Sequence, residues 1–212
     1  MPQIINRIIR VMIMSDIIFH SGWGLLGPVF AIFIVQNIEV ASVAEAAKVA
    51  GFASLVYWVV KSFLQIPIGR YLDKNHGEKD DLWFMVIGTF LTGLAPFGFI
   101  ISTLPGHVYF FQALQAIGMA MVIPSWSAVF TRHIDQGKEA FEWSVRSTSL
   151  GFATGLTGAA GGITAALFGF KTIFVLAGSL SFVSALLLLL IHKEVAPHDK
   201  ILPHTPRFKM PF

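Results

Sequence analysis

The residues most able to do chemistry in this sequence are polar side chains that interrupt long apolar segments. An ionisable group inside a bilayer costs about 2.5–3.5 kcal/mol on insertion scales, so it faces protein or water. Several of these side chains recur three, four or seven residues apart, which places them on one face of a helix. They are Asp16, His20, Trp23, Tyr57, Lys61, Gln65, Gln112, Gln115, Trp126 and Arg146. Aromatic rings, amides and a Lys or Arg would together suit a small polar or anionic solute.

Each ionisable residue in this set also has a structural interpretation. Asp16 either contacts a solute or pairs with a charge on a neighbouring helix. Lys61 either lines a solute pathway, forms a salt bridge with Asp16, or snorkels along its apolar stem. His20 is a candidate for proton transfer, because imidazole is the side chain whose charge changes nearest to neutral pH. Arg146 either serves the pathway or reaches the cytoplasmic interface.

The elements that must position these residues are membrane-spanning helices. Of the 212 residues, 55% are hydrophobic and 13% are charged, against about 25% charged in soluble domains. The sequence therefore predicts an all-α integral membrane protein with six transmembrane helices of about 20 residues or more. The predicted spans are residues 11–36, 46–68, 82–103, 108–131, 141–168 and 172–191. They form one domain, 1–192, followed by a proline-containing cytoplasmic tail, 193–212.

The distribution of Lys and Arg predicts the orientation of these spans. Eleven of these residues lie in the N-terminal segment, the second and fourth loops and the tail. The opposite loops hold two, Lys48 and Lys171. Because positive residues favour the cytoplasmic side, both termini are expected inside the cell, in a multi-pass protein of the cell membrane.

An internal repeat relates the first and fourth predicted spans. Gly22 and Pro28 in the first span correspond to Gly118 and Pro124 in the fourth, at a common offset of 96 residues. This pattern indicates a three-plus-three repeat, which is typical of secondary transporters.

The loop between the second and third spans reads Gly69-Arg-Tyr-Leu-Asp73-Lys74-Asn-His-Gly77-Glu-Lys79. It resembles the Gly-x-x-x-Asp-(Arg/Lys)-x-Gly-(Arg/Lys) signature of major facilitator superfamily (MFS) transporters, with one additional residue before Gly77. The resemblance implies that this segment is a gating loop formed by Gly69, Asp73, Lys74 and Gly77.

Two further segments resemble the same family. Gln112-Ala-Leu-Gln115-Ala-Ile-Gly118 is similar to its fourth span, with Gln112 where the family has an Arg associated with proton-coupled antiport. Uniport or symport is therefore favoured over drug efflux, and protons stay a candidate coupling ion. The glycine-rich fifth span resembles that of the family as well. It implies close helix packing at Gly151, Gly155, Gly158 and Gly162.

The family fold has two six-helix halves, and this chain resembles the N-terminal half. A single half would leave a polar cavity wall against lipid. The resemblance therefore implies a side-by-side homodimer or pairing with a different half-sized protein. The function that it implies is transport of a small polar organic solute, a sugar or an organic anion, by alternating access. A non-transporting membrane accessory protein is the alternative.

Other functional classes have no motif in this sequence. The Gly-x-Ser-Gly, Gly-x-Gly-Asp, His-Glu-x-x-His and Walker patterns are absent. The sequence contains no Cys, which excludes thiolate metal ligands and Cys nucleophiles. We therefore expect no enzymatic activity, no cofactor, no metal site and no nucleic-acid partner.

Overall fold

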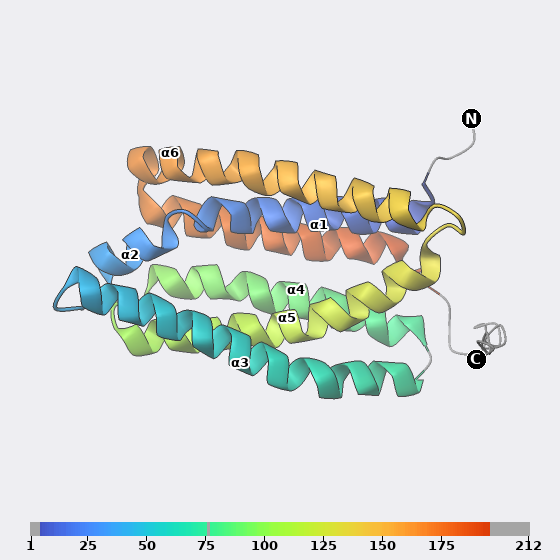
Figure 1. Ribbon diagram of the computed structural model, residues 1–212, viewed down its shortest axis with the longest axis horizontal. Coiled ribbons are helices and arrows are strands. Elements are labelled where there is room, and N and C mark those ends of the chain that lie inside the picture. Colours follow the sequence, from blue (N-terminus) through green and yellow to red (C-terminus); the bar gives the residue numbers. More distant parts are fainter. Residues whose placement is uncertain (1–4, 76, 196–212) are drawn as a thin grey trace, which may run out of the picture.

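The computed structural model describes residues 5–75 and 77–195, and within those ranges it contains helices and turns but no strand (Figure 1). The helices are α1 (Arg7–Leu26), α2 (Phe30–Asn37), α3 (Val43–Asn75), α4 (Glu78–Ile100), α5 (Pro105–His133), α6 (Glu139–Leu188) and the short 3₁₀ helix η1 (Leu189–Ile191). The predicted all-α architecture is confirmed. Five helices are long and apolar enough to cross a membrane, namely α1, α3, α4, α5 and α6 with its continuation through η1.

The helices differ from the predicted spans mainly at their ends. For example, α3 begins three residues before position 46 and ends seven residues after position 68. Hydropathy marks only the apolar stretch, whereas a helix continues through polar turns until a cap or a turn ends it. At the start of α1 that cap is Asn6, whose side-chain oxygen accepts a hydrogen bond from the backbone N–H of Ile9 at 2.9 Å.

The first predicted span is divided into α1 and α2 by Gly27, Pro28 and Val29. Pro28 has no backbone N–H to continue the helical ladder. The backbone N–H of Val29 instead donates to the carbonyl oxygen of Leu26 at 3.1 Å, which closes a tight turn. The bend therefore comes from the proline that the sequence repeat had singled out.

α6 contains a reversal of the chain at Gly169. Its φ is 77° and its ψ is 170°, a conformation that glycine adopts without steric cost. The helix turns back on itself there, so residues 139–168 and 170–188 form two arms (Figure 1). These arms coincide closely with the two predicted spans 141–168 and 172–191.

The helices pack as two related groups. α1 lies along α6 and α3 lies along α5, whereas α4 lies against both α5 and α6 (Figure 1). The proposed first repeat comprises α1 to α4, and the second comprises α5 and the two arms of α6. The helices of the first repeat therefore contact those of the second extensively. The two groups are held together through α4 and the second arm of α6.

Glycines of the 96-residue repeat mark equivalent helix crossings. A Cβ added at Gly22 of α1 would lie 3.0 Å from the carbonyl oxygen of Ala177 in the second arm of α6. A Cβ added at Gly118 of α5 would lie 2.6 Å from the carbonyl oxygen of Gly88 in α4. Each glycine thus allows its helix to approach the third helix of the other repeat.

A second pair of glycines shows the same reciprocity. Gly93 of α4 faces the ring of Phe182 in α6, and Gly178 of α6 faces the ring of Phe97 in α4. The two rings stack at 5.5 Å between centroids with an interplanar angle of 18°. Each Phe follows its own helix's Gly by four residues, so this crossing is built twice from one pattern. The packing supports the three-plus-three repeat.

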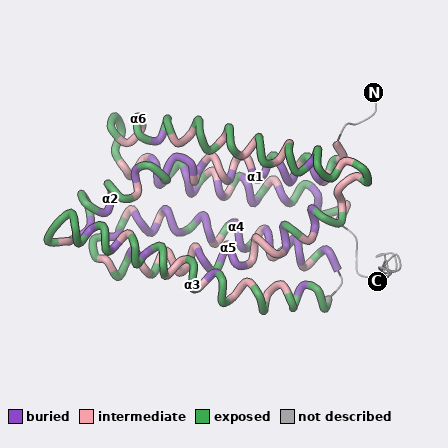
Figure 2. The backbone as a smooth tube through the Cα atoms, in the orientation of Figure 1, coloured by how far each residue is buried: buried purple, intermediate pink, exposed green. Residues whose placement is uncertain are grey.

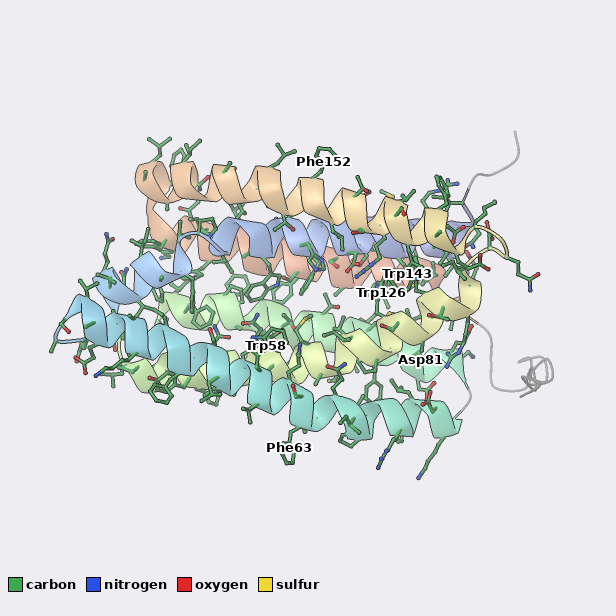
Figure 3. The ribbon with its side chains drawn as sticks, viewed as in Figure 1. Trp58, Phe63, Asp81, Trp126, Trp143 and Phe152 are labelled. Carbon is green, nitrogen blue, oxygen red and sulfur yellow. The ribbon has the colours of Figure 1, made fainter. Side chains whose placement is uncertain are left out.

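Exposure divides the helices into inner and outer sets. Half of the apolar window of α1 and of α4 is buried, whereas only 17% of that of α3 is buried. Figure 2 shows the buried residues concentrated in the centre of the bundle. Large apolar side chains cover the outer faces of α3 and of the first arm of α6: Phe52, Trp58, Phe63, Phe152, Leu156 and Leu167. Phe63 and Phe152 point away from the bundle (Figure 3). These faces must contact lipid or another protein.

Candidate functional site

A small cavity lies beside the bend between α1 and α2. Its volume is about 240 Å³. Its polar lining comes from Trp23 of α1 and from Gln112 and Gln115 of α5. The remaining lining residues are Leu26, Gly27, Phe30 and Phe99. The structure thus brings together three of the predicted pathway residues, from two helices that the repeat relates.

Two polar atoms at this cavity have no hydrogen-bond partner among the described residues. They are the indole Nε1 of Trp23 and the amide Oε1 of Gln115, and both are buried. A buried polar group without a partner costs about 1–3 kcal/mol. One atom is a donor and the other an acceptor, and both belong to residues that line the cavity.

Asp16 and Arg146 form an ion pair between α1 and the first arm of α6. Nη2 and Nε of Arg146 both donate to Oδ2 of Asp16, at 2.7 and 2.8 Å. Their side chains are 10% and 23% exposed. Of the two sequence interpretations for Asp16, the geometry provides the paired one. Its partner is Arg146 and not Lys61, because α1 packs along α6 and not along α3.

Aromatic rings complete this ion pair. The guanidinium carbon of Arg146 lies 3.9 Å from the centroid of Trp126 and 5.7 Å from that of Trp143. Figure 3 shows the two tryptophans close together, and Trp126 stacks on Phe130 at 4.5 Å. His20 lies on the other side, with Nδ1 2.9 Å from the carbonyl oxygen of Asp16. We name Asp16, His20, Trp126 and Arg146 the ion-pair cluster.

Lys61 is buried on α3 without a carboxylate partner. The residue is 8% exposed. Its Nζ lies 3.7 Å from the ring centroid of Trp58 and 5.5 Å from that of Tyr57. Among the described residues, no acidic side chain forms a salt bridge with it. Gln65 is half-buried one helical turn further along the same helix.

The signature loop spans the end of α3 and the start of α4. Gly69 faces the ring of Pro124, since an added Cβ would lie 3.7 Å from it. Asp73 and Lys74 are exposed, and Gly77 is the residue that precedes α4. The assignment of these residues to a gate stays a prediction.

Sequence reasoning missed a charged network next to this loop. Arg132 at the end of α5 pairs with the fully buried Asp81 of α4. Nδ1 of His133 lies 3.6 Å from Oε1 of Glu78. The available signal was the placement of acidic residues in the first turn of one helix and of Arg132-His133 at the end of the next. Antiparallel neighbours bring such ends together.

Asn6 joins the start of α1 to the loop between α5 and α6. Its Nδ2 donates to the carbonyl oxygen of His133 at 2.6 Å and to Oδ1 of Asp135 at 3.1 Å. Together with a bond from Lys138, the Asn6 bond holds the pKa of Asp135 below its ordinary value. This contact fixes the start of α1, the helix that carries Asp16 and His20.

The predicted packing glycines divide into two groups. Gly158 lies near Gly24, with an added Cβ 3.7 Å from its carbonyl oxygen. Gly151, Gly155 and Gly162 have no neighbour within 4 Å of an added Cβ. α1 and α6 also approach closely at Gly161, which belongs to the same glycine-rich segment but not to the four predicted packing glycines, and which lies against the backbone of Leu25. The open glycines are therefore free to pack against another protein.

Comparison with known proteins places this fold. The model of the Major Facilitator Superfamily matches residues 12–211. The crystal structure of the POT family transporter PepTSo matches with a TM-score of 0.68 at 16% identity. An auto-inhibited POT family peptide transporter matches with a TM-score of 0.72 at 15% identity. Each match covers 95% of this chain and 39% of the other, so the chain spans about two fifths of their length. Comparison with curated proteins gives no significant match.

Proposed function

The chain belongs to the Major Facilitator Superfamily, and we propose that it carries a small polar organic solute, a sugar or an organic anion, across the membrane by alternating access. The family consists of transporters and not of enzymes. The observation that carries the proposal is the cavity with a buried donor on Trp23 and a buried acceptor on Gln115. A folded protein keeps such groups without partners at a cost, and a bound solute would remove that cost.

We place the solute between α1 and α5, at Trp23, Gln112 and Gln115. These two helices carry the equivalent positions of the 96-residue repeat. The bend at Gly27 and Pro28 interrupts α1 beside this cavity. A discontinuous helix at a solute site is a recurrent feature of secondary transporters.

The ion-pair cluster is proposed as the coupling element. Asp16 and His20 are titratable groups in contact with each other, 3.5 Å apart between Nδ1 and Oδ1. Gln112 supplies no charge at the position where the family has an Arg. We therefore propose uniport, or symport with protons, in preference to antiport.

We propose that the functional unit contains a second six-helix half, supplied by a second copy of this chain. The outer faces of α3 and the first arm of α6 support this assembly because they expose large apolar side chains. The open glycines Gly151, Gly155 and Gly162 lie on the same arm. The competing assembly is a pair with a different half-sized protein, and the competing function is that of a membrane accessory protein.

Counterflow into proteoliposomes tests the transport function. Liposomes preloaded with one member of a panel of sugars and organic acids should accumulate the same labelled solute. The assay is run with and without a pH gradient, which separates uniport from proton symport. The matched control is Trp23→Phe with Gln115→Leu, which removes the donor and the acceptor. Absence of accumulation for every solute would contradict the proposal.

The absence of native Cys makes assembly and orientation directly testable. A single Cys at Gly155 should crosslink to a second copy in lipid, whereas a single Cys at the outer end of the bundle, at Lys48, should not. Labelling from outside should reach Cys at Lys48 or Lys171 and should not reach Cys at Lys138. A monomeric mass in lipid without crosslinking would exclude the homodimer. Labelling of Lys138→Cys from outside would reverse the orientation.

A further inference from the structure

We propose that Lys61 binds the negative charge of the solute and that this solute is a small carboxylate. The inference rests on the proposed transport function and narrows its solute class from polar molecules in general to organic anions. It rests on the position of Lys61 in the bundle, on the charges around it and on the neighbouring cavity.

Lys61 lies on the inner face of α3, near the middle of that helix. It is 18 residues after Val43 and 14 residues before Asn75. Ala53, Lys61 and Leu72 are all buried, and their spacing places them on the face that packs against α5. Within the predicted span 46–68, Lys61 is 15 residues from one end and seven from the other, about 22 and 10 Å along the helix. Lys61 therefore lies inside the span, and the anion that we propose for it is the carboxylate of a solute.

The amide of Gln115 lies at about the same depth as Lys61. α3 and α5 run in the same direction (Figure 1), and Gly69 of α3 faces Pro124 of α5. Eight residues before these two positions are Lys61 and Ala116, the neighbour of Gln115. Two packed helices with the same rise per residue keep such positions level. The backbone positions of Lys61 and Gln115 thus lie at about one level of two adjacent helices.

The charges inside the membrane leave Lys61 uncompensated. Three charged residues lie more than three positions inside the predicted spans, namely Asp16, Lys61 and Arg146. Asp16 and Arg146 neutralise each other, and both donors of that contact go to one carboxylate oxygen. Arg146 is also covered by Trp126. Lys61 is therefore the cation that a solute can reach without breaking an ion pair.

The aromatic rings beside Lys61 attract its ammonium but do not replace the oxygen acceptors that its N–H groups would bond. The Trp58 ring lies on one side, 3.7 Å from Nζ, and the Tyr57 ring is further away at 5.5 Å. An ammonium has three N–H donors, and no carboxylate of the described residues takes them. A carboxylate accepts such donors in short, charge-assisted hydrogen bonds.

The charge of Lys61 favours an anionic solute. The cavity of about 240 Å³ lies on the neighbouring helices, and Lys61 itself is not one of its lining residues. One uncompensated positive charge per chain matches one carboxylate group. The donor on Trp23 and the acceptor on Gln115 would hold a hydroxyl or amide elsewhere on the same molecule. A short hydroxy acid or acid amide meets these requirements, and a neutral sugar does not use Lys61.

Matched pairs of probes that differ only in charge test the inference. The purified full chain is tested for binding and counterflow with lactate against lactamide and with glucuronate against glucose. We expect at least one carboxylate to raise the thermal unfolding temperature and to be transported, while its neutral partner is not. Lys61→Met should weaken binding of that carboxylate roughly 10- to 100-fold. Lys61→Arg should retain part of it.

Two controls separate binding from folding. Lys48→Met removes an exposed Lys from the same helix and should leave binding unchanged. Lys61→Met without solute should unfold at the same temperature as the wild type or higher, because it removes a buried charge. A purely structural Lys61 would give the opposite result, a lower unfolding temperature with unchanged carboxylate binding, and would overturn the inference.

The outcomes also separate this inference from the transport function. Transport of neutral probes, unaffected by Lys61→Met, would overturn the carboxylate site and leave the transport function standing. A wild-type chain that neither binds nor transports any probe would contradict both.

Discussion

Two polar regions inside this bundle differ in whether their charged groups are paired. The ion-pair cluster, centred on Asp16 and Arg146, satisfies its own charges through two short contacts and an aromatic ring, although the indole Nε1 of its Trp126 is buried without a hydrogen-bond partner among the described residues. The region around the cavity leaves its groups open. Among the described residues, the indole N–H of Trp23 has no acceptor and the amide oxygen of Gln115 has no donor. The buried Lys61 has no carboxylate partner among them either.

The difference separates groups that hold the fold from groups that await a ligand. A buried ion pair that is broken on one side costs about 3–5 kcal/mol, so its members are coupled to folding. A buried group without a partner costs stability already, so its replacement by an apolar residue need not destabilise the protein. Mutation should therefore lower stability in the ion-pair cluster and leave it unchanged or higher at the cavity, whereas solute binding should weaken at the cavity.

The largest expected effect is on stability, in the ion-pair cluster. Arg146→Met leaves the Asp16 carboxylate buried without a counter-charge and should lower the free energy of unfolding by about 3 kcal/mol or more. The measurement is unfolding in detergent, by temperature or by increasing SDS. The double variant Asp16→Asn with Arg146→Met should recover most of the loss because no charge is left unpaired. If Arg146→Met is as stable as the wild type, the ion pair does not stabilise the fold, and the two regions do not differ in this respect.

The next effect is on transport, at the cavity. Gln115→Leu should weaken solute binding about tenfold, because one net hydrogen bond is lost, and should leave the free energy of unfolding unchanged or higher. Counterflow at several solute concentrations gives the apparent affinity. The control is Gln36→Leu, an exposed Gln at the end of α2. If Gln115→Leu instead destabilises the chain and leaves transport unchanged, Gln115 serves the fold and does not bind the solute.

A smaller effect tests the aromatic side of the ion pair. Trp126→Phe should weaken the contact with the guanidinium by about 0.5–1 kcal/mol, because a benzene ring attracts it less strongly than indole does. Loss of the buried Nε1, which has no hydrogen-bond partner among the described residues, offsets part of this effect on the free energy of unfolding. In the Arg146→Met background the loss should shrink, and a double-mutant cycle measures this coupling. Trp143→Phe is the matched control, since its ring lies 5.7 Å from the guanidinium carbon instead of 3.9 Å. Equal losses for the two tryptophans would assign the effect to packing alone.

The smallest effect lies outside both regions, at Asp135 between α5 and α6. The bonds from Asn6 and Lys138 hold the pKa of this carboxyl below its ordinary value of 3.8. The folded state therefore binds a proton less readily than the unfolded state. The resulting stabilisation is fully present above pH 3.8, the ordinary pKa of the carboxyl. It is lost as the pH falls from there through the lower pKa of the folded state.

Unfolding temperatures between pH 6 and pH 3 measure this dependence. In Asp135→Asn the unfolding temperature should fall slightly less steeply towards acid pH than in the wild type. Asn6→Ala should reduce this steepness less, and it also removes the cap of α1. An unchanged slope in Asp135→Asn would mean that the exposed carboxyl contributes nothing, as many surface pairs do.

Much of the fold was accessible from the sequence. The apolar segments predicted the helices, and the arms of α6 agree with the last two predicted spans because Gly169, where the chain reverses, lies in the gap between those spans. The offset of 96 residues predicted a repeat, and the reciprocal packing of Gly93 with Phe182 and of Gly178 with Phe97 supports it. The division of the first span at Pro28 was not predicted, because hydropathy does not register a break in hydrogen bonding.

The candidate site was only partly accessible. Trp23, Gln112 and Gln115 were predicted together and do line one cavity. Asp16 and Arg146 were placed in the same pathway, whereas the structure pairs them with each other. The pairs Arg132 with Asp81 and His133 with Glu78 were missed because their members lie about 50 residues apart, at helix ends that carry no hydropathy signal.

The sequence by itself determined that this chain is a helical membrane protein and which residues interrupt its apolar segments. Both follow from local properties, namely composition and periodicity along one helix. Only the tertiary structure decided which polar residues are already paired. Asp16 meets Arg146 across 130 positions of sequence, whereas Lys61 forms no salt bridge with any carboxylate in the part of the chain that the structure describes. Such pairing depends on the register and neighbour order of packed helices, which no single helix encodes.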